Sequence, residues 1–118
     1  MAFTQTAHVV HAVALPDADL TESPLAPDQV VSGAPEVRFL ALHESDDLAV
    51  GLWQHSTGVS TDVEADEVFV VLSGRATIEI ADGPTLEVGP GDVGLLPAGA
   101  VTRWTIHETL RKVYVVRP

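Results

Sequence analysis

The sequence contains no cysteine, few basic residues and no long apolar run. The absence of cysteine excludes disulfide bonds and thiolate zinc sites, although imidazole and carboxylate ligands for a metal are present. Six Lys and Arg against 17 Asp and Glu give a net charge of -11, which disfavours nucleic acids and anionic membranes as partners. Apolar runs such as Val68–Leu72 fall well short of the roughly 20 residues that a membrane-spanning helix needs.

The few basic residues are also unevenly placed. Residues 1–74 hold twelve acidic residues and one base, Arg38, whereas residues 75–118 hold five of each kind. Because no Lys or Arg precedes Arg38, the basic start of a secretory signal is missing, and we expect a cytoplasmic protein. With 118 residues, 46% of them apolar, the chain has the size and the apolar content of one folded domain.

The N-terminal part of the chain has a composition of its own. Residues 16–35 contain four of the eight prolines and little periodic apolar pattern, which predicts an arm or linker. The segment before it, His8–Leu15, has the composition of a short strand, placed on a sheet edge or on another subunit. We therefore divide the chain into an N-terminal strand and Pro-rich arm, residues 1–36, and a folded domain, residues 37–118.

After residue 36 the chain consists of short β-type runs separated by turn residues, with no amphipathic helix of useful length. Polar and apolar residues alternate most clearly at Arg75–Ile80, and Asp82-Gly83 is a hairpin signal. This pattern predicts an all-β sandwich or barrel of antiparallel strands. The nine predicted strands are Val37–His43, Leu48–His55, Val59–Glu64, Val68–Leu72, Arg75–Ile80, Thr85–Val88, Val93–Leu96, Val101–Ile106 and Lys112–Val116.

Two motifs in this region resemble those of the cupin family. The first is a glutamate followed by six residues and a glycine, Glu67–Gly74, and the second is a Gly-Asp-x4-Pro-x-Gly pattern, Gly91–Gly99. The stretch Trp104–Val116, with Gly51–Trp53 upstream, is similar to one branch of the family. That branch comprises the small cupin 3 (DUF861) domains, related to the cupin part of ethanolamine-utilisation and ureidoglycine-aminohydrolase proteins. The resemblance implies a cupin-type jelly-roll β-barrel.

The same resemblance implies where a cupin metal would bind. Metal-binding cupins place two histidines six and four residues before the glutamate, and a third histidine three residues after the last glycine of the second motif. The corresponding residues here are Thr61, Val63 and Thr102, so that Glu67 is the one remaining ligand type. A single carboxylate holds a transition metal poorly. We therefore expect no conventional cupin metal and no cofactor.

Glu67 is the first candidate for acid/base catalysis. By strand parity with Thr61 and Val63, its carboxylate faces the barrel interior. A buried carboxylate without a metal must be paired with a cation, accept hydrogen bonds or have a raised pKa. All three conditions are common at catalytic sites. The alternative is a structural bond to Arg103, Arg111 or a backbone donor.

His55 and Tyr114 are the other candidate catalytic residues. His55 has a side chain that titrates near neutral pH, although its place at a strand end is more typical of an exposed histidine. Tyr114 can act together with Glu67 as an acid/base pair. The tryptophans predict a stacking wall at the barrel mouth, or else plain core residues. The predicted pocket residues are Trp53, Thr61, Val63, Thr102 and Trp104.

Asp62, Glu64 and Asp66 have the opposite strand parity to Glu67. We expect them on a solvated outer face or charged edge, with a divalent-cation site as the alternative. The sequence also contains no Gly-x-Ser-x-Gly elbow and no phosphate-binding glycine loop. Hydrolysis through a covalent intermediate is therefore not expected.

These observations favour a small-molecule-binding cupin that lacks the histidine-ligated metal and carries metal-free acid/base activity of the isomerase, lyase or cyclase type. Two alternatives stay open. One is a metal-dependent enzyme with an oxygen-rich site built from Glu67 with Asp62, Glu64 or His55, and the other is a non-catalytic binding or sensor module. We expect a small-molecule ligand and a homodimer, and neither nucleic acid nor membrane as a partner.

Overall fold

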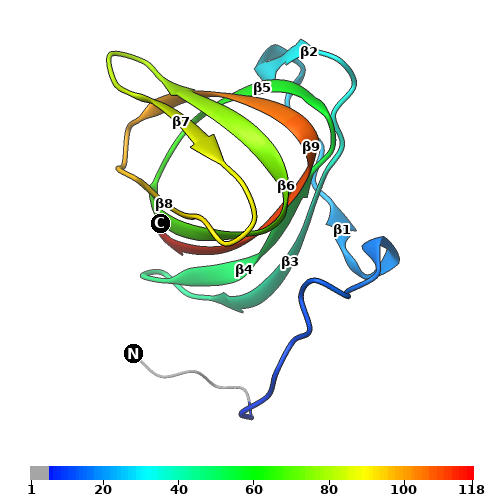
Figure 1. Cartoon of the computed structure of the whole chain (residues 1–118). Coiled ribbons are helices and arrows are strands. Elements are labelled where there is room, and N and C mark those ends of the chain that lie inside the picture. Colours follow the sequence, from blue (N-terminus) through cyan, green and yellow to red (C-terminus); the bar gives the residue numbers. More distant parts are fainter. Residues whose placement is uncertain (1–5) are drawn as a thin grey trace.

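The computed structural model describes residues 6–118, and within them nine β-strands form one antiparallel sheet (Figure 1). The sheet curls into a jelly-roll barrel, so the predicted all-β fold is confirmed. Two short 3-10 helices, η1 and η2, lie in the N-terminal arm. The elements are η1 (Asp17–Asp19), β1 (Thr21–Glu22), η2 (Pro27–Gln29), β2 (Val30–Ser32), β3 (Val37–Glu44), β4 (Ala49–His55), β5 (Gly58–Val63), β6 (Asp66–Ile80), β7 (Thr85–Val88), β8 (Val93–Leu96) and β9 (Val101–Arg117).

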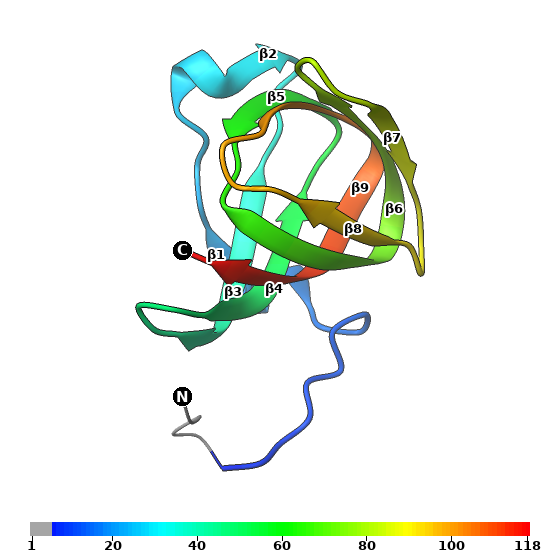
Figure 2. The ribbon, with the colours of Figure 1, turned by 90° about the vertical axis from the view of Figure 1, so that its left-hand side faces the viewer.

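Two long strands, β6 and β9, lie side by side along the curled sheet (Figures 1 and 2). Their pairing runs from Asp66 opposite Arg117 to Ile80 opposite Thr102. On its other side, β9 pairs with β4 through its second half and with β5 through its first half. Strand β6 likewise pairs with β8 through its first half and with β7 through its second half. Each long strand therefore belongs to both layers of the barrel.

The sequence predicts each of these long strands as two shorter ones, and this division is wrong. The apparent turns, Ser73-Gly74 and residues 107–111, lie opposite one another at register shifts within a continuous pairing. Gly74 has a φ of +88°, and a Cβ there would collide with the backbone of Thr109. Glycine thus lets the strands bend at a bulge while they stay paired.

The N-terminal arm differs from its predicted form. His8–Leu15 pairs with no edge of this chain's own sheet, so a strand on that edge is wrong, while its placement on another subunit stays a prediction. The Pro-rich part supplies two edge strands instead, because β1 pairs with β3 and β2 pairs with β5. Figure 2 shows the first part of the arm, in blue, rising from below the barrel towards β1. The arm therefore completes two edges of the sheet.

One buried side chain of β9 holds the arm against the barrel. The guanidinium of Arg111 donates through Nη1 to the carbonyl oxygens of Ala12 and Leu15, at 2.7 and 2.8 Å. Its Nη2 donates to the carboxylate of Asp17 at 2.9 Å, and its Nε donates to Gln54 Oε1 on β4, also at 2.9 Å. Arg111 thus ties the arm to two neighbouring strands.

Apolar side chains fill the space between the layers, but they also point outward. Outward-pointing examples are Val63, Val93 and Leu95, which are 66%, 57% and 70% exposed. Gly94, between the last two, leaves room for the ring of Phe69, which a Cβ would strike. The buried core consists of Phe69, Val71, Ala76, Ile78, Leu96, Trp104, Ile106 and Leu110.

No helix in residues 6–118 has the length and the apolar character that a membrane crossing requires. The predicted homodimer, the small-molecule ligand and the cytoplasmic location stay predictions. The boundary at residue 36 also stays a prediction, although strands on both sides of it pair with one another.

A candidate ligand site in the barrel

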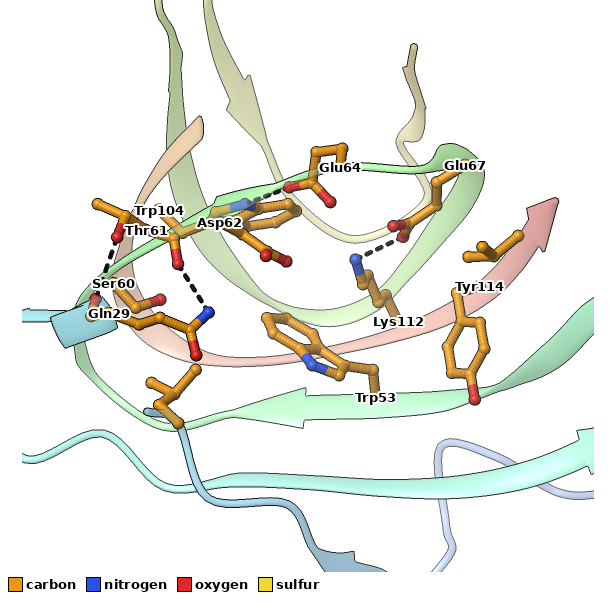
Figure 3. A pocket seen from close by; sticks show the side chains of 12 residues that line it. Gln29, Trp53, Ser60, Thr61, Asp62, Glu64, Glu67, Trp104, Lys112 and Tyr114 are labelled. Carbon is orange, nitrogen blue, oxygen red and sulfur yellow. Dashed lines mark hydrogen bonds and ion pairs between the residues drawn. The ribbon is translucent and has the colours of Figure 1, made fainter. Parts of the chain in front are cut away.

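A cavity of about 220 Å³ lies among β4, β5, β6 and β9 (Figure 3). Both tryptophans of the chain face it, together with three acidic side chains and one lysine. Aromatic walls with a few convergent polar groups are typical of small-molecule sites. The lining residues are Leu25, Gln29, Trp53, Ser60, Thr61, Asp62, Glu64, Glu67, Trp104, Lys112, Tyr114 and Val116.

A buried ion pair crosses one side of the cavity. Lys112 Nζ donates to Glu67 Oε2 at 2.6 Å, and the two side chains are only 6% and 9% exposed. The same ammonium lies 4.5 Å from the ring centroid of Trp53, 4.6 Å from that of Trp104 and 4.7 Å from that of Phe69. These rings replace part of the hydration that the buried ammonium has lost.

The partners that the sequence suggests for Glu67 lie elsewhere. Arg111 points to the outer face and binds the arm, and Arg103 is exposed. Lys112 points inward because side chains alternate along β9, so that residue 112 shares a face with Tyr114. Glu67 does face the interior, and its cationic partner is Lys112.

A second carboxylate, that of Glu64, is also buried at this cavity. Its Oε2 accepts hydrogen bonds from Thr102 Oγ1 at 2.7 Å and from Trp104 Nε1 at 3.2 Å. Burial raises the pKa of Glu64, the two hydrogen bonds oppose this rise, and the negative charges of Asp62 and Glu67 add to it. A carboxyl group in this state can exchange a proton with a bound molecule.

Replacing Glu64 with glutamine should change how stability depends on pH. A raised pKa means that the folded protein holds a proton that the unfolded chain releases. The protonated carboxyl of Glu64 therefore contributes its full share of the stability below about pH 4.5, the group's ordinary pKa. This share is lost as the pH rises through the raised pKa. Relative to wild type, Glu64→Gln should therefore gain stability as the pH rises through this window. Urea unfolding at a series of pH values measures the difference.

The control for that experiment is Glu79→Gln, which removes an exposed carboxylate on the outer face of β6. The stability difference between this variant and wild type, measured over the same pH range, is the baseline for Glu64→Gln. A difference for Glu64→Gln that follows this baseline would contradict a raised pKa at Glu64.

The solvated outer face or charged edge predicted for Asp62, Glu64 and Asp66 is wrong for Glu64. Glu64 is buried at the cavity, whereas Asp62 is exposed where it lines the cavity and Asp66 is exposed away from it. The reason is that β5 ends at Val63 and β6 begins at Asp66, so strand parity cannot be counted across the two residues between them. The pocket position predicted for Val63 is wrong for the same reason, because this side chain points outward.

The other predicted pocket residues lie at the cavity. Trp53, Thr61 and Trp104 line it, and Thr102 lies behind it, where its hydroxyl supports Glu64. The rings of the two tryptophans are in contact, with their centroids 5.6 Å apart. Trp104 also belongs to the buried core, so the two interpretations given for the tryptophans both describe it.

Tyr114 lines the cavity near the ion pair (Figure 3). Burial raises the pKa of its phenol, and the negative charges of Glu44 and Glu67 raise it further. The phenol of Tyr114 is thus neutral, and its hydroxyl packs over Gly51 on β4, where a Cβ would strike it.

His55 is fully buried rather than exposed at a strand end. Its ring packs beside that of Trp53, with the centroids 5.3 Å apart. Burial lowers the pKa of His55, the hydrogen bond to the backbone of Ser56 opposes this, and the positive charge of Lys112 lowers the pKa further. His55 is therefore a neutral imidazole behind the cavity wall.

The residues at the cupin ligand positions do not fit a metal ion. Glu67 binds the ammonium of Lys112, Val63 points away, and the hydroxyl of Thr102 donates to Glu64. Across residues 6–118, no three His, Asp or Glu side chains come together in a group that could hold a metal ion. These contacts argue against the alternative oxygen-rich metal site as well.

Sequence reasoning did not place Lys112, Glu64 or Ser60 in the interior. For Lys112 the sequence did contain a signal, because strand alternation places it on the same face as Tyr114, a predicted site residue. For Ser60 the alternation along β5 was misleading, because the polar side chains of this strand face the cavity while Val63 faces outward. Glu64 lies between two strands, where alternation gives no direction.

Residues 42–114 match the family model described as the EutQ-like cupin domain. The chain belongs to the EutQ-like cupin family. The match covers both cupin motifs and leaves out the N-terminal arm. The family predicted from the two motifs is thus confirmed, while no curated protein matches this EutQ-like cupin.

Solved structures share the fold of this EutQ-like cupin. The EutQ protein of Clostridium difficile is 19% identical, with a TM-score of 0.65 over 81% of each chain. A putative ethanolamine utilization protein Q of Salmonella typhimurium is 25% identical, with a TM-score of 0.62 over 70% of each chain. A DUF861 protein of unknown function from Pseudomonas syringae is 28% identical, with a TM-score of 0.73 over 82% of this chain and 43% of that one.

Proposed function

We propose that this cupin binds a small organic molecule in the barrel cavity and exchanges a proton with it through Glu64, without a metal ion. The observation that carries the proposal is the ion pair between Lys112 and Glu67. Because Lys112 neutralises the one carboxylate at the cupin metal positions, Glu64 is left as the acid/base group. A pKa raised by burial brings a carboxyl closer to the pH at which it transfers protons efficiently.

The size and the charge of the cavity limit the ligand. A volume of about 220 Å³ lies below the range of roughly 300–1,000 Å³ that is typical of drug-sized ligands, so the ligand is small. The lining carries the acidic residues Asp62, Glu64 and Glu67 against the single base Lys112. This excess of negative charge disfavours phosphorylated and carboxylate ligands and favours neutral or cationic ones. We therefore propose a small amine or amino alcohol.

The chain offers a direct optical probe of this proposal. Its two tryptophans, Trp53 and Trp104, both line the cavity, so intrinsic fluorescence reports on binding there. We would titrate the protein with a panel of small primary amines and with carboxylates of the same size. The name of the Salmonella protein makes ethanolamine the first amine, and glycolate is its anionic counterpart. The amines should produce a saturable change at concentrations at least about tenfold lower than the carboxylates, a difference of about 1.4 kcal/mol.

Two glutamate variants make the test specific. Glu64→Gln should weaken amine binding by about tenfold, because an amide, unlike the carboxyl of Glu64, cannot transfer a proton to the amine and become the counter-ion of the bound ammonium. The matched Glu79→Gln removes an exposed charge on the outer face and should leave the titration unchanged. Carboxylates that bind as tightly as the amines, or amines that produce no saturable change, would refute the proposed ligand class.

A further inference from the structure

A serine and a histidine form a buried hydrogen-bonded pair at the wall of the cavity. Ser60 on β5 lines the cavity and is 4% exposed, and His55 at the end of β4 is fully buried behind it. The distance from Ser60 Oγ to His55 Nε2 is 2.8 Å. A nucleophile and a base within this distance, with the base held by a third group, make the arrangement used in nucleophilic catalysis.

The third group determines which nitrogen of His55 carries the proton. His55 Nδ1 lies 2.6 Å from the carbonyl oxygen of Ser56, and a carbonyl can only accept a hydrogen bond. Nδ1 therefore holds the hydrogen, and Nε2 has a free lone pair. The hydroxyl of Ser60 must then donate its hydrogen to Nε2, which is the direction that a general base requires.

The protonation state of His55 suits the same role. Its pKa lies below the ordinary value, chiefly because the ring is buried. The imidazole is therefore neutral and able to take a proton at neutral pH. Here the backbone carbonyl of Ser56 orients the ring, in the place that a carboxylate occupies in the usual triad.

We propose that Ser60 is a nucleophile, activated by His55, for acyl transfer from a small ester that enters the cavity. Ser60 Oγ attacks the carbonyl carbon of the ester while its proton passes to His55 Nε2. The bond to the leaving alkoxide then breaks, and His55 returns the proton to the alkoxide, so that an alcohol leaves and an acyl-serine remains. Water, deprotonated by His55, hydrolyses this ester to the carboxylic acid and restores Ser60.

The surrounding charges favour a neutral or cationic ester. The lining contains Asp62 and Glu64, whose carboxyl groups disfavour an anionic substrate. This reaction goes beyond the proton exchange proposed for Glu64, because it uses a different pair of residues in the same cavity. It also revises the expectation from the sequence that no serine nucleophile is present.

The experiment uses phenylmethylsulfonyl fluoride, which sulfonylates activated serines with loss of fluoride, and locates the adduct by mass spectrometry. Wild-type protein should gain one adduct, on Ser60. Ser60→Ala should gain none, and His55→Gln should react at least about 100-fold more slowly, since a general base typically contributes 10²–10⁴-fold. Release of 4-nitrophenol from 4-nitrophenyl acetate should show the same order of rates.

The chain provides a matched control in a second hydroxyl–histidine pair. Thr77 Oγ1 lies 2.7 Å from His107 Nε2 on the outer face, away from the cavity, but it donates its hydrogen to Glu87 Oε2 at 2.8 Å rather than to the imidazole. Thr77 should acquire no adduct, and Thr77→Ala should leave the labelling of Ser60 unchanged. This comparison separates a hydroxyl that donates its hydrogen to an imidazole at the cavity from one that merely has a histidine beside it.

Because His55 is buried, its variant can fail to fold, and the wild-type protein supplies a second measurement. The labelling rate of Ser60 should rise as the pH increases through the titration of His55, and it should vanish in urea-unfolded protein. The proposal is overturned if folded wild-type protein gains no adduct on Ser60, or gains it on Tyr114 or Lys112 instead. The proposal is also overturned if Ser60 is labelled as fast in folded His55→Gln, or in urea-unfolded protein, as in the folded wild-type protein.

Discussion

Replacing Lys112 with methionine should lower the free energy of unfolding by about 3–5 kcal/mol, because removing one partner leaves the other charge buried and unpaired. The unpaired charge is the carboxylate of Glu67, whose side chain is 9% exposed. Methionine keeps most of the length of the lysine stem, so the loss reports on charge more than on packing. Urea denaturation followed by circular dichroism measures it.

The opposite substitution should cost less. Glu67→Gln leaves the ammonium of Lys112 among three aromatic rings, and such contacts contribute up to roughly 2 kcal/mol when desolvated. The double variant should be more stable than Lys112→Met alone, since it contains no unpaired charge. Arg75→Met is the control, because it breaks an exposed ion pair with Glu108 that is worth less than about 1 kcal/mol. If Glu67→Gln destabilises the protein as much as Lys112→Met, the aromatic rings do not support the ammonium.

Replacing Arg111 with methionine should lower the free energy of unfolding by about 2–3 kcal/mol and release the N-terminal arm. The guanidinium donates to two arm carbonyls, to Asp17 and to Gln54, and hydrogen bonds that involve a charged group contribute roughly 1.5–3 kcal/mol each. Partial hydration of the freed carbonyls offsets part of the loss. Hydrogen–deuterium exchange should become faster in residues 12–20 before the barrel unfolds.

The control for Arg111 is Asp17→Asn. The side chain of Asp17 is 68% exposed, so its removal from the ion pair should cost less than about 1 kcal/mol and should leave exchange in the arm slow. If hydrogen–deuterium exchange in the arm is as slow in Arg111→Met as in wild type, then β1 and the other arm contacts hold this segment without the guanidinium.

Most of the fold could be predicted because turn residues and short β-type runs are local signals. The strands from β3 to β5, together with β7 and β8, begin and end within one residue of their predicted bounds. The long strands could not be predicted as single units, because a bulge that keeps two strands paired has the same local composition as a turn. The edge strands β1 and β2 depend on distant partners, which a Pro-rich segment does not reveal.

The candidate site was less predictable, and the reason lies in its polarity. Strand alternation identifies an interior face when that face is apolar, but here polar residues such as Ser60 and Lys112 point inward while Leu95 and Val63 point outward. The first cupin motif correctly predicted that the side chain of Glu67 points into the barrel. Its partner could not be predicted, because the pairing of Glu67 with Lys112 depends on how β6 and β9 align across 45 positions of sequence.

The continuous pairing of β6 with β9 also determines when the site can form during folding. Asp66 pairs with Arg117, 51 positions further along the chain, and every other contact of this ladder also closes a long loop. Such non-local pairing is slow, typically in the range of milliseconds to seconds. Because β9 carries Trp104 and Lys112, a nascent chain that ends before this strand has Glu64 and Glu67 but no cavity. Closure of the barrel and assembly of the site are therefore a single kinetic event.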